Sequence, residues 1–313
     1  MYKRQVPELA ERWEVSQDGK LVTFHLRAGV MWHDGKPFGA RDVKATFDKI
    51  VDKTTKAAHL RATLRELDRY EVTDDATIRF HFKTPHFVAL DTFASIPIQP
   101  AHVIERLTGS EYNQARTNPL NRAPVGTGPF KLERWESNVK IVLGRHAGYW
   151  GKRAHLDRLV FRQVMEANVG LKLAEAGELH VVTRVDPEEW ARMANRKGLT
   201  AHYDRSRFNN YSYAWIGWNQ KNERFRDKRV RRALTMLTDR AGIIKSLMYG
   251  LFTPTDCHFY VESKELCVPD APKLAYDPKG AAKLLDEAGW KDRDSDGVLD
   301  KACLLYTSPS PRD

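Results

Sequence analysis

The sequence lacks any apolar run of about 18 residues, and it therefore predicts no membrane-spanning helix. The segment Met1–Trp13 carries charge but no apolar core, so it does not read as a signal peptide. Hydrophobic residues make up 42% and charged residues 29% of the 313 residues, which is the balance of a globular protein with room for two domains. Taken alone, these absences favour a protein of the cytoplasm.

Catalytic signatures are also lacking. The sequence contains no G-x-S-x-G, H-E-x-x-H, C-x-x-C, Walker A or Rossmann motif, and its 11 histidines show no ligand pairing at helical spacing. The glycines at 126 and 128 do not form a phosphate loop, because no Gly-Lys-Ser/Thr ending follows and Pro129 removes a backbone donor. His33 and Asp34 precede Gly35 in a predicted turn. We therefore expect no enzyme and no cofactor.

The net charge of +10 would suit a nucleic-acid partner, but the sequence lacks the features that accompany one. The lysines and arginines are spread along the chain and form no single cluster. No zinc-ligand spacing, aromatic RNA-binding signature or basic amphipathic helix is present. We expect no nucleic-acid partner and interpret the charge as that of a basic surface.

Cysteine is scarce, with three in the chain. One of them, Cys303, lies in the segment 302–313, ACLLYTSPSPRD, which breaks from the preceding pattern and resembles translated read-through of a sequencing adapter. This tail contains one Arg and one Asp, so its exclusion leaves the net charge unchanged. The two cysteines that remain for the fold are Cys257 and Cys267.

Strand and helix patterns alternate along most of the chain. Alternating apolar residues predict strands at 21–27, 30–32, 71–83 (in two pieces), 130–135, 139–145, 156–164 and 179–185. Apolar stripes of helical period predict helices near 40–51, 100–107, 167–178, 187–195 and 277–288. The alternation favours layers of an α/β protein.

The segment 211–252 organises the rest of the chain. Its first part, Tyr211–Trp218, is apolar or aromatic at almost every position, which predicts a strand buried on both faces. A helical stripe runs from Val230 to Met248, and Thr238-Asp239 in its middle resembles an N-cap. We therefore predict two short helices in place of one long helix.

Three separate segments carry a pattern that identifies a family. In FRDKRVRRALTMLTDRAGIIKSLMYG (225–250) the matching positions are Phe225, Asp227, Arg229, Val230, Arg231, Ala233, Leu234, Asp239, Arg240, Ile243, Ile244 and Gly250. The second segment is WHDGKPFGARDV (32–43), in which Gly39 replaces a helix-capping Thr and predicts a weaker helix start, and the third is PVGTGPFKLERW (124–135). All three resemble the family 5 extracellular solute-binding proteins, the peptide- and nickel-binding receptors of bacterial ABC importers.

The resemblance implies an α/β, two-lobed periplasmic-binding-protein fold of the class II type, with an inserted α+β subdomain and a truncated second lobe. We expect residues 1–37 and 124–224 in the first lobe, residues 38–123 in the inserted subdomain, and residues 225–301 at the start of the second lobe. The match begins near Glu8, inside what is a mature protein in the family, so we expect the signal peptide to be missing from this sequence.

By the same resemblance, the intact protein is expected to be an exported monomer in the periplasm or at the cell surface. It would capture short peptides between two closing lobes and deliver them to an ABC permease at the membrane. Peptide is preferred because it is the commonest ligand class of the family. The alternative is a receptor of the same class that binds nickel complexes, haem or oligosaccharide.

Ligand-contacting residues are suggested in one place only. Tyr213, Trp215, Trp218 and Asn219 lie on the predicted strand that enters the hinge, where aromatic side chains would line a ligand cavity. The alternative is that these side chains pack in the core.

Two further features lie near the end of the sequence. An oxidising compartment favours a disulfide between Cys257 and Cys267, which have nine residues between them in a loop-rich segment. Asp292, Asp294 and Asp296 fit the opening of a calcium loop, but its twelfth position, where a bidentate Glu belongs, falls in the excluded tail. A bound ion and a solvated acidic turn both stay open, and we assign no metal site.

Overall fold

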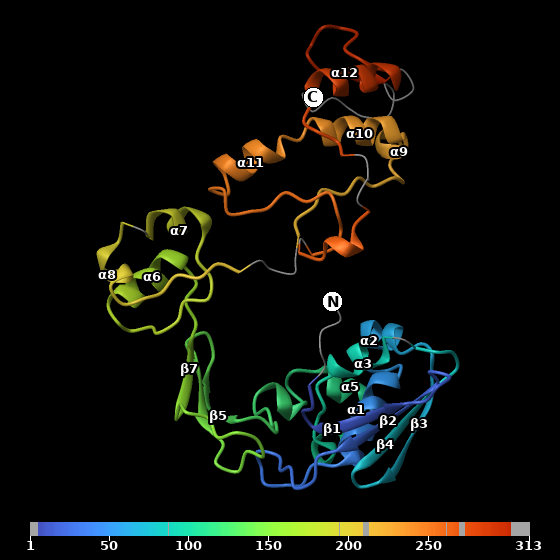
Figure 1. The fold of residues 1–313 in the computed structure, drawn as a ribbon, viewed down its shortest axis with the longest axis vertical. Helices are drawn as coiled ribbons and strands as arrows, with labels where there is room; N and C mark the ends of the chain where they lie inside the picture. Colours follow the sequence, from blue (N-terminus) through green and yellow to red (C-terminus); the bar gives the residue numbers. More distant parts are fainter. Residues whose placement is uncertain are drawn as a thin grey trace. The chain divides into compact units, whose positions relative to one another are not determined.

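The computed structural model describes residues 6–86, 88–193, 195–208, 213–260, 262–268 and 273–301 (Figure 1). The chain divides into an amino-terminal unit of residues 2–164 and a carboxy-terminal unit of residues 165–313, and each unit is described by itself. Among the described residues, no helix is both long enough and apolar enough to cross a membrane.

An antiparallel sheet of four strands forms the core of the amino-terminal unit. Its strands are β1 (Ala10–Val15), β2 (Leu21–Leu26), β3 (Leu67–Asp74) and β4 (Thr77–Phe82), in the order β1-β2-β4-β3. The strand predicted at 21–27 and the hairpin predicted at 71–83 are confirmed. The strand predicted at 30–32 is reduced to a single bridge between Met31 and Pro37.

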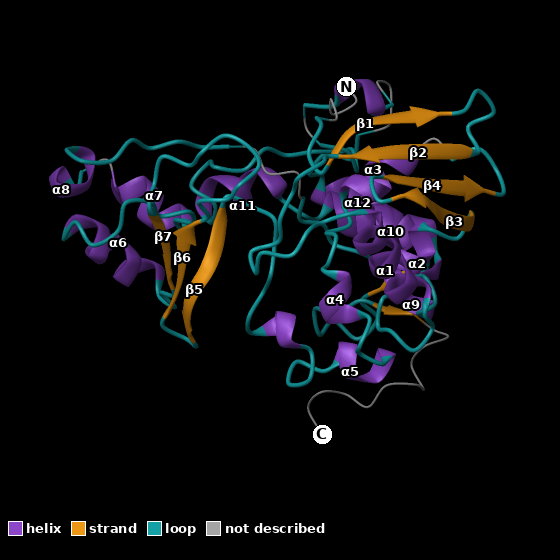
Figure 2. Ribbon diagram, turned by 90° about the horizontal axis from the view of Figure 1, so that it is seen from below, coloured by secondary structure: helices purple, strands orange, loops and turns teal. Residues whose placement is uncertain are grey.

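The alternation in β4 determines which face of this sheet is buried. Ile78, Phe80 and Phe82 are 0%, 1% and 4% exposed, as their shared period of two requires. Helix α1 (Ala40–Val51) packs against β3 and β4 (Figure 2). Its Phe47 ring lies 4.7 Å from the ring of Phe80. The buried face is therefore aromatic, and it is covered by the amphipathic α1 together with Phe93, whose ring lies 4.5 Å from that of Phe80.

This core includes residues on both sides of the predicted boundary at 37/38. Val22 and Trp32 lie before that boundary, Phe47 and Phe80 lie after it, and all four belong to one buried cluster. Strand β2 also pairs directly with β4. The division into lobes and subdomain stays a prediction, and its first boundary passes through a single hydrophobic core.

A buried carboxylate in the first turn of α1 holds the start of this helix. Gly39 has no side chain to accept a hydrogen bond, as the sequence indicated. Instead, Oδ2 of Asp42 accepts from the Gly39 backbone N–H at 2.9 Å and from Trp32 Nε1 at 3.2 Å. Oδ1 accepts from the Ala101 backbone N–H at 2.7 Å. Asp42, 5% exposed, thereby joins three segments of the unit.

Short helices complete this part of the unit. They are α2 (Ala58–Thr63), α3 (Ala89–Ala94), α4 (Ala101–Ile104), α5 (Gly109–Asn113) and a 3-10 turn at Pro119–Asn121. Helix α4 packs on α1, so the predicted helix near 100–107 is confirmed in a shorter form.

A second antiparallel sheet contains β5 (Phe130–Glu136), β6 (Lys140–Arg145) and β7 (Arg158–Arg162) in that order. The predicted hairpin of β5 and β6 is confirmed, and its link places Asn138 at a φ of 62°. Val160 and Phe161 are neighbours on β7 and so point to opposite faces. They are 58% and 56% exposed, so within the described chain this end of the sheet is uncovered on both sides.

The carboxy-terminal unit begins with three helices around a small core: α6 (Ala167–Glu175), α7 (Pro187–Met193) and α8 (Lys197–Thr200). The prediction of a strand at 179–185 is wrong. Leu179, Val182 and Val185 instead pack against the buried Leu171 and Met193 of the helices. The apolar residues whose spacing suggested a strand instead lie in a loop, where they cover the helical core.

The rest of this unit is organised by α10 (Lys228–Met236), which packs against α12 (Pro278–Glu287). It also contains α9 (Glu223–Arg226), α11 (Arg240–Ser246), a 3-10 turn at Lys264–Leu266, and the short strands β8 (Trp290–Lys291) and β9 (Asp300–Lys301). The predicted break into two helices is confirmed, because Asp239 caps α11 by accepting from the Gly242 N–H at 2.8 Å.

Candidate ligand-binding site

The candidate segment, residues 213–219, is exposed. Tyr213, Trp215 and Ile216 are 44%, 73% and 62% exposed, and the segment forms no strand. The prediction of a strand buried on both faces is therefore wrong for 213–218, while Tyr211 lies outside the described residues. Such a strand requires paired neighbours and a layer on each face, and the described part of the unit supplies no sheet partner here.

The four predicted contact residues have different neighbours. The Tyr213 ring lies 6.0 Å from the ring of His258, and the Trp218 ring lies 5.4 Å from that of Phe225. Asn219 Oδ1 accepts a hydrogen bond from the Lys221 backbone N–H at 3.1 Å. The structure therefore brings Tyr213 to the loop that holds the cysteines and Trp218 to α9, and it does not gather the four side chains around one point.

The Trp215 ring folds back over the backbone of its own segment. A methyl group added at Gly217 would lie 2.0 Å from Cζ3 of that ring, so a glycine is needed for this arrangement. Trp215 nevertheless stays largely exposed and does not pack in the core of the described residues. A large, rigid apolar ring in this position can contact a ligand or another part of the protein.

The loop that Tyr213 contacts is closed by a disulfide. Cys257 and Cys267 are joined in the structure, and their Cα atoms lie 5.8 Å apart, within the usual range for such a bond. We define the residues from Cys257 to Cys267 as the disulfide loop. This closure limits the conformations open to the side chains beside Tyr213.

One arginine anchors the start of the disulfide loop. Arg240 Nη1 donates to the Thr255 carbonyl oxygen at 3.1 Å and to Asp256 Oδ1 at 2.7 Å. Its Nη2 donates to the Leu274 carbonyl oxygen at 3.4 Å. Arg240 is one of the family-matching positions of α11, so the pattern that identified the family also holds this loop in place.

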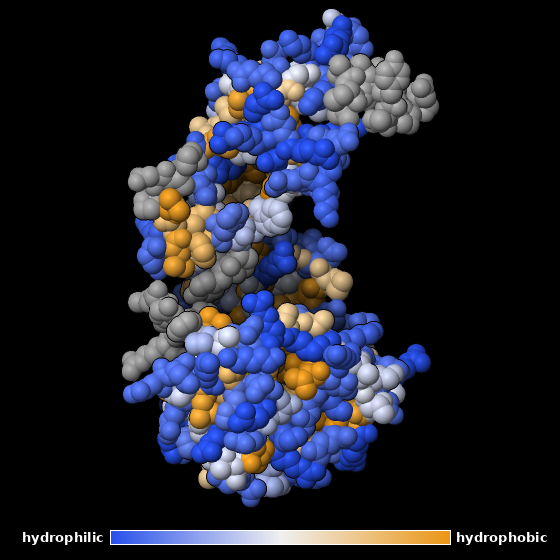
Figure 3. Space-filling view, turned by 90° about the vertical axis from the view of Figure 1, so that its right-hand side faces the viewer, coloured by the Kyte–Doolittle hydropathy of each residue, from blue (hydrophilic) through white to orange (hydrophobic). Residues whose placement is uncertain are grey.

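Sequence reasoning missed the apolar part of the disulfide loop. Phe259 and Leu266 are 50% and 53% exposed, and Val268 immediately after it is 73% exposed. The aromatic pair His258-Phe259 next to a cysteine was the available signal. Figure 3 shows scattered apolar patches within a mostly hydrophilic exterior on the side that it draws.

An ion pair between Asp227 and Arg229 lies at the start of α10. The Arg229 guanidinium and backbone N–H donate to the Asp227 carboxylate, which lowers the pKa of Asp227 to about 2. Arg229 Nη1 also donates to the Glu287 carbonyl oxygen at 2.8 Å, which ties the start of α10 to the end of α12. These contacts hold the two helices together.

The acidic loop that contains Asp292, Asp294 and Asp296 is compatible with a bound ion and with a solvated turn. Asp292, Asp294 and Asp296 are exposed, and each offers an oxygen within 4.8 Å of the others. Backbone amides of the same loop also donate to these carboxylates, at 3.1 Å for Gly297 to Asp292 Oδ2 and 2.7 Å for Val298 to Asp296 Oδ1. Such bonds are those of an ordinary acidic turn, and we assign no ion to it.

Comparison with known proteins extends beyond these local features. A family model described as Bacterial extracellular solute-binding proteins, family 5 Middle, matches residues 4–313. The oligopeptide-binding protein AppA of Bacillus subtilis is 32% identical over 304 residues, covering 94% of this chain and 53% of AppA. The chain spans about half the length of the curated relatives it matches.

Solved structures share the fold. AppA from Bacillus subtilis in complex with a nonapeptide matches with a TM-score of 0.73 and 29% identity, over 94% of this chain and 57% of that chain. NikZ from Campylobacter jejuni in complex with Ni(L-His) matches with a TM-score of 0.77 over 95% and 57% of the two chains, and at 23% identity it supports the fold alone. The predicted α/β fold of the periplasmic-binding-protein type is confirmed.

Proposed function

Because the chain belongs to the bacterial extracellular solute-binding proteins of family 5, we propose that the intact protein is the substrate-binding receptor of an ABC importer. It captures short peptides between two closing lobes and releases them unchanged to a membrane permease. It acts as a monomer in the periplasm or at the cell surface.

One observation carries the choice of peptide. The relative that matches 94% of this chain at 32% identity is named an oligopeptide-binding protein. A solved relative at 29% identity holds a nonapeptide. Nickel complexes, haem and oligosaccharide are the ligand classes to which a failed peptide test would point.

The geometry of the 213–219 segment suits a peptide. Among the described residues, the backbone of 213–218 makes no hydrogen bond to another backbone group. An extended peptide can pair with such free N–H and C=O groups, while Tyr213 and Trp215 provide apolar walls. Main-chain pairing makes affinity insensitive to peptide sequence, which is what a nutrient receptor requires. We propose Tyr213, Trp215, Trp218 and Asn219 as contributors to ligand contact.

The test is titration calorimetry on the intact, full-length protein, called the parent below, with a library of di- to pentapeptides. We expect saturable binding and recovery of intact peptide by mass spectrometry. Trp215→Ala should weaken binding about tenfold, since an aromatic contact is worth about 1 kcal/mol beyond its buried area.

The matched control is Trp135→Ala, which removes an exposed tryptophan from β5 in the other unit. Its affinity should equal that of the parent. If no peptide binds and a nickel–histidine complex, haem or an oligosaccharide binds saturably, that ligand class would replace peptide in the proposal. Consumption of the ligand with time would refute the receptor proposal itself.

A further inference from the structure

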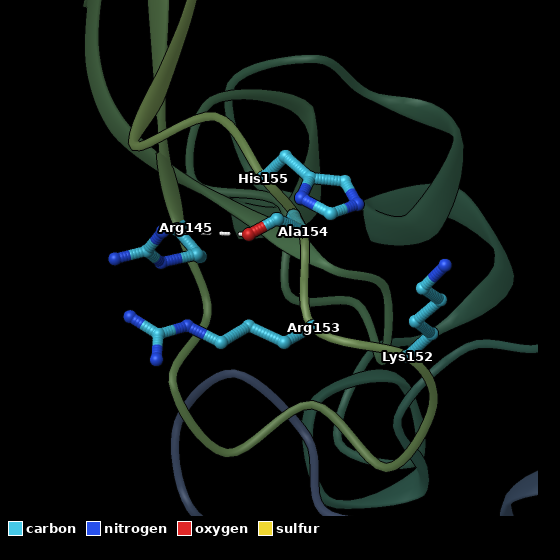
Figure 4. A pocket seen from close by; sticks show the side chains of 5 residues that line it. All are labelled: Arg145, Lys152, Arg153, Ala154 and His155. Carbon is cyan, nitrogen blue, oxygen red and sulfur yellow. Dashed lines mark hydrogen bonds between the residues drawn. The ribbon is translucent and has the colours of Figure 1, made fainter.

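The connection between β6 and β7 forms an open depression of about 390 Å³ in the amino-terminal unit. It is lined by Arg145, Lys152, Arg153, Ala154 and His155 (Figure 4). Three of these five side chains are permanent cations, a fourth is a histidine, and none is acidic. We call it the cationic depression. Its lining differs from that of the candidate peptide segment, which is aromatic.

Arg145 gives the cationic depression a fixed wall. Its Nη2 lies 2.7 Å from Asp157 Oδ1, and its Nη1 donates to the Ala154 carbonyl oxygen at 3.4 Å. The Arg145 backbone N–H also donates to the Asp157 carbonyl oxygen at 2.8 Å. These contacts hold Arg145 in place at the end of β6, and its side chain stays 24% exposed.

Lys152 and Arg153 supply charge that the surrounding residues do not neutralise. Within the described part of the chain, neither side chain makes an ion pair or hydrogen bond, and both residues are exposed. The one carboxylate at the site, Asp157, is already paired with Arg145. Figure 4 shows the side chains of Arg145 and Arg153 extending in the same direction from the loop.

The chemistry of the lining defines the class of anion. A guanidinium presents two parallel N–H groups that match two oxygens of a phosphate or carboxylate, and an ammonium adds a mobile point charge. An excess of three permanent cations over one carboxylate favours a ligand with more than one negative charge. The depression is open to solvent, so the anion can be free or attached to a larger group.

We propose that the cationic depression binds a multiply charged oxyanion of the phosphate class, either free phosphate or the phosphate of a lipid headgroup. This binding is independent of the proposed capture of peptides, because its residues lie in the other unit from residues 213–219. The two experiments can therefore fail separately.

The first experiment measures binding of inorganic phosphate to the full-length parent by calorimetry at low ionic strength. The second measures sedimentation with phosphatidylcholine vesicles that contain or lack phosphatidylglycerol. The test variant is the double substitution Lys152→Gln with Arg153→Gln, which leaves the structural Arg145 in place. The control, Lys53→Gln with Arg116→Gln, removes the same charge from exposed cations of the same unit.

We expect the test variant to lose at least about tenfold in phosphate affinity and the control to keep it, since each charge-assisted bond contributes a factor of this order. Phosphate binding without vesicle binding would identify free phosphate as the ligand. Vesicle binding that requires phosphatidylglycerol and is displaced by phosphate would identify the headgroup. Absence of both, or equal losses in the test and control variants, would overturn the proposal.

Discussion

Single side chains hold distant segments of this protein together, and Asp42 is the clearest case. Its carboxylate accepts three hydrogen bonds from donors in three segments. We expect Asp42→Ala to lower the free energy of unfolding by about 3 kcal/mol, because buried donors lose their acceptor at once. Denaturant unfolding of the parent and the variant measures this difference in the free energy of unfolding.

The control for Asp42 is Glu11→Ala, which removes an exposed carboxylate of β1 in the same unit. Its unfolding midpoint should match that of the parent. Asp42→Asn should lie between the two, since the amide retains one acceptor oxygen. An Asp42→Ala variant as stable as the control would show that the three hydrogen bonds contribute no net stability.

His33 gives the second prediction at this scale. Its Nδ1 accepts from the Gly126 backbone N–H at 3.1 Å, and its Nε2 lies 3.0 Å from the Gly128 carbonyl oxygen, so a neutral ring fits the site. Burial lowers the pKa of His33, and the nearby His146 and Lys131 lower it further, against the opposing effects of the Gly128 carbonyl and Asp34. The unfolded chain therefore binds the proton more tightly than the folded chain does.

The contribution of His33 to stability should then be fully present above about pH 6.5 and be lost as the pH drops below that value, since the unfolded state gains the proton first. Urea unfolding of the parent and of His33→Gln between neutral and mildly acidic pH tests this. The variant should be less stable at neutral pH and show a shallower loss on acidification. Equal slopes would assign the acid sensitivity to other groups.

At the scale of elements, the helix ends were predictable and some strands were not. Asp239 lies where a helix needs an acceptor, and its side chain makes that bond in the structure. Ile78 and Phe80 alternate with polar residues, and β4 forms with that face buried. A cap or an alternating pattern depends on residues close in sequence, so such elements can be predicted locally.

The two strand predictions that were wrong share a physical cause. Residues 179–185 and 213–218 have strand-like composition, but a strand exists only where another strand pairs with it, and no local pattern reports that. The same limit applies to the candidate site, because the contact of Tyr213 with His258 joins segments far apart in sequence. The positions of Tyr213 and Trp215 in the chain were predictable, and their exposure and neighbours were not.

At the scale of elements, the disulfide loop gives a testable prediction. Before reduction, thiol titration of the unfolded 313-residue chain should detect one reactive cysteine, Cys303, and after reduction three. Replacing Cys257 and Cys267 by Ser should lower stability by about 2 kcal/mol, because a short closed loop restricts the unfolded chain. Three reactive thiols before reduction would contradict the bond.

At the scale of the whole molecule, the exposed end of the β5-β6-β7 sheet gives a prediction about how the 313-residue chain behaves in solution. Val160 and Phe161 expose apolar surface on opposite faces of β7, and uncovered surface of this kind promotes association. We expect Val160→Lys with Phe161→Lys to raise the soluble fraction of the 313-residue chain, as measured by centrifugation and light scattering. Val15→Lys, a single exposed valine of β1, should change it little. No gain from the double substitution would place the cause of association elsewhere.

The strand order β1-β2-β4-β3 also has a consequence for how the chain acquires its structure. The two hairpins, β1 with β2 and β3 with β4, can each form from nearby residues, but the pairing of β2 with β4 must wait until α1 and β3 have been synthesised. Contacts between segments so far apart have a high entropic cost of closure, and they slow folding. We therefore expect the central pairing of β2 with β4 to form after the two hairpins.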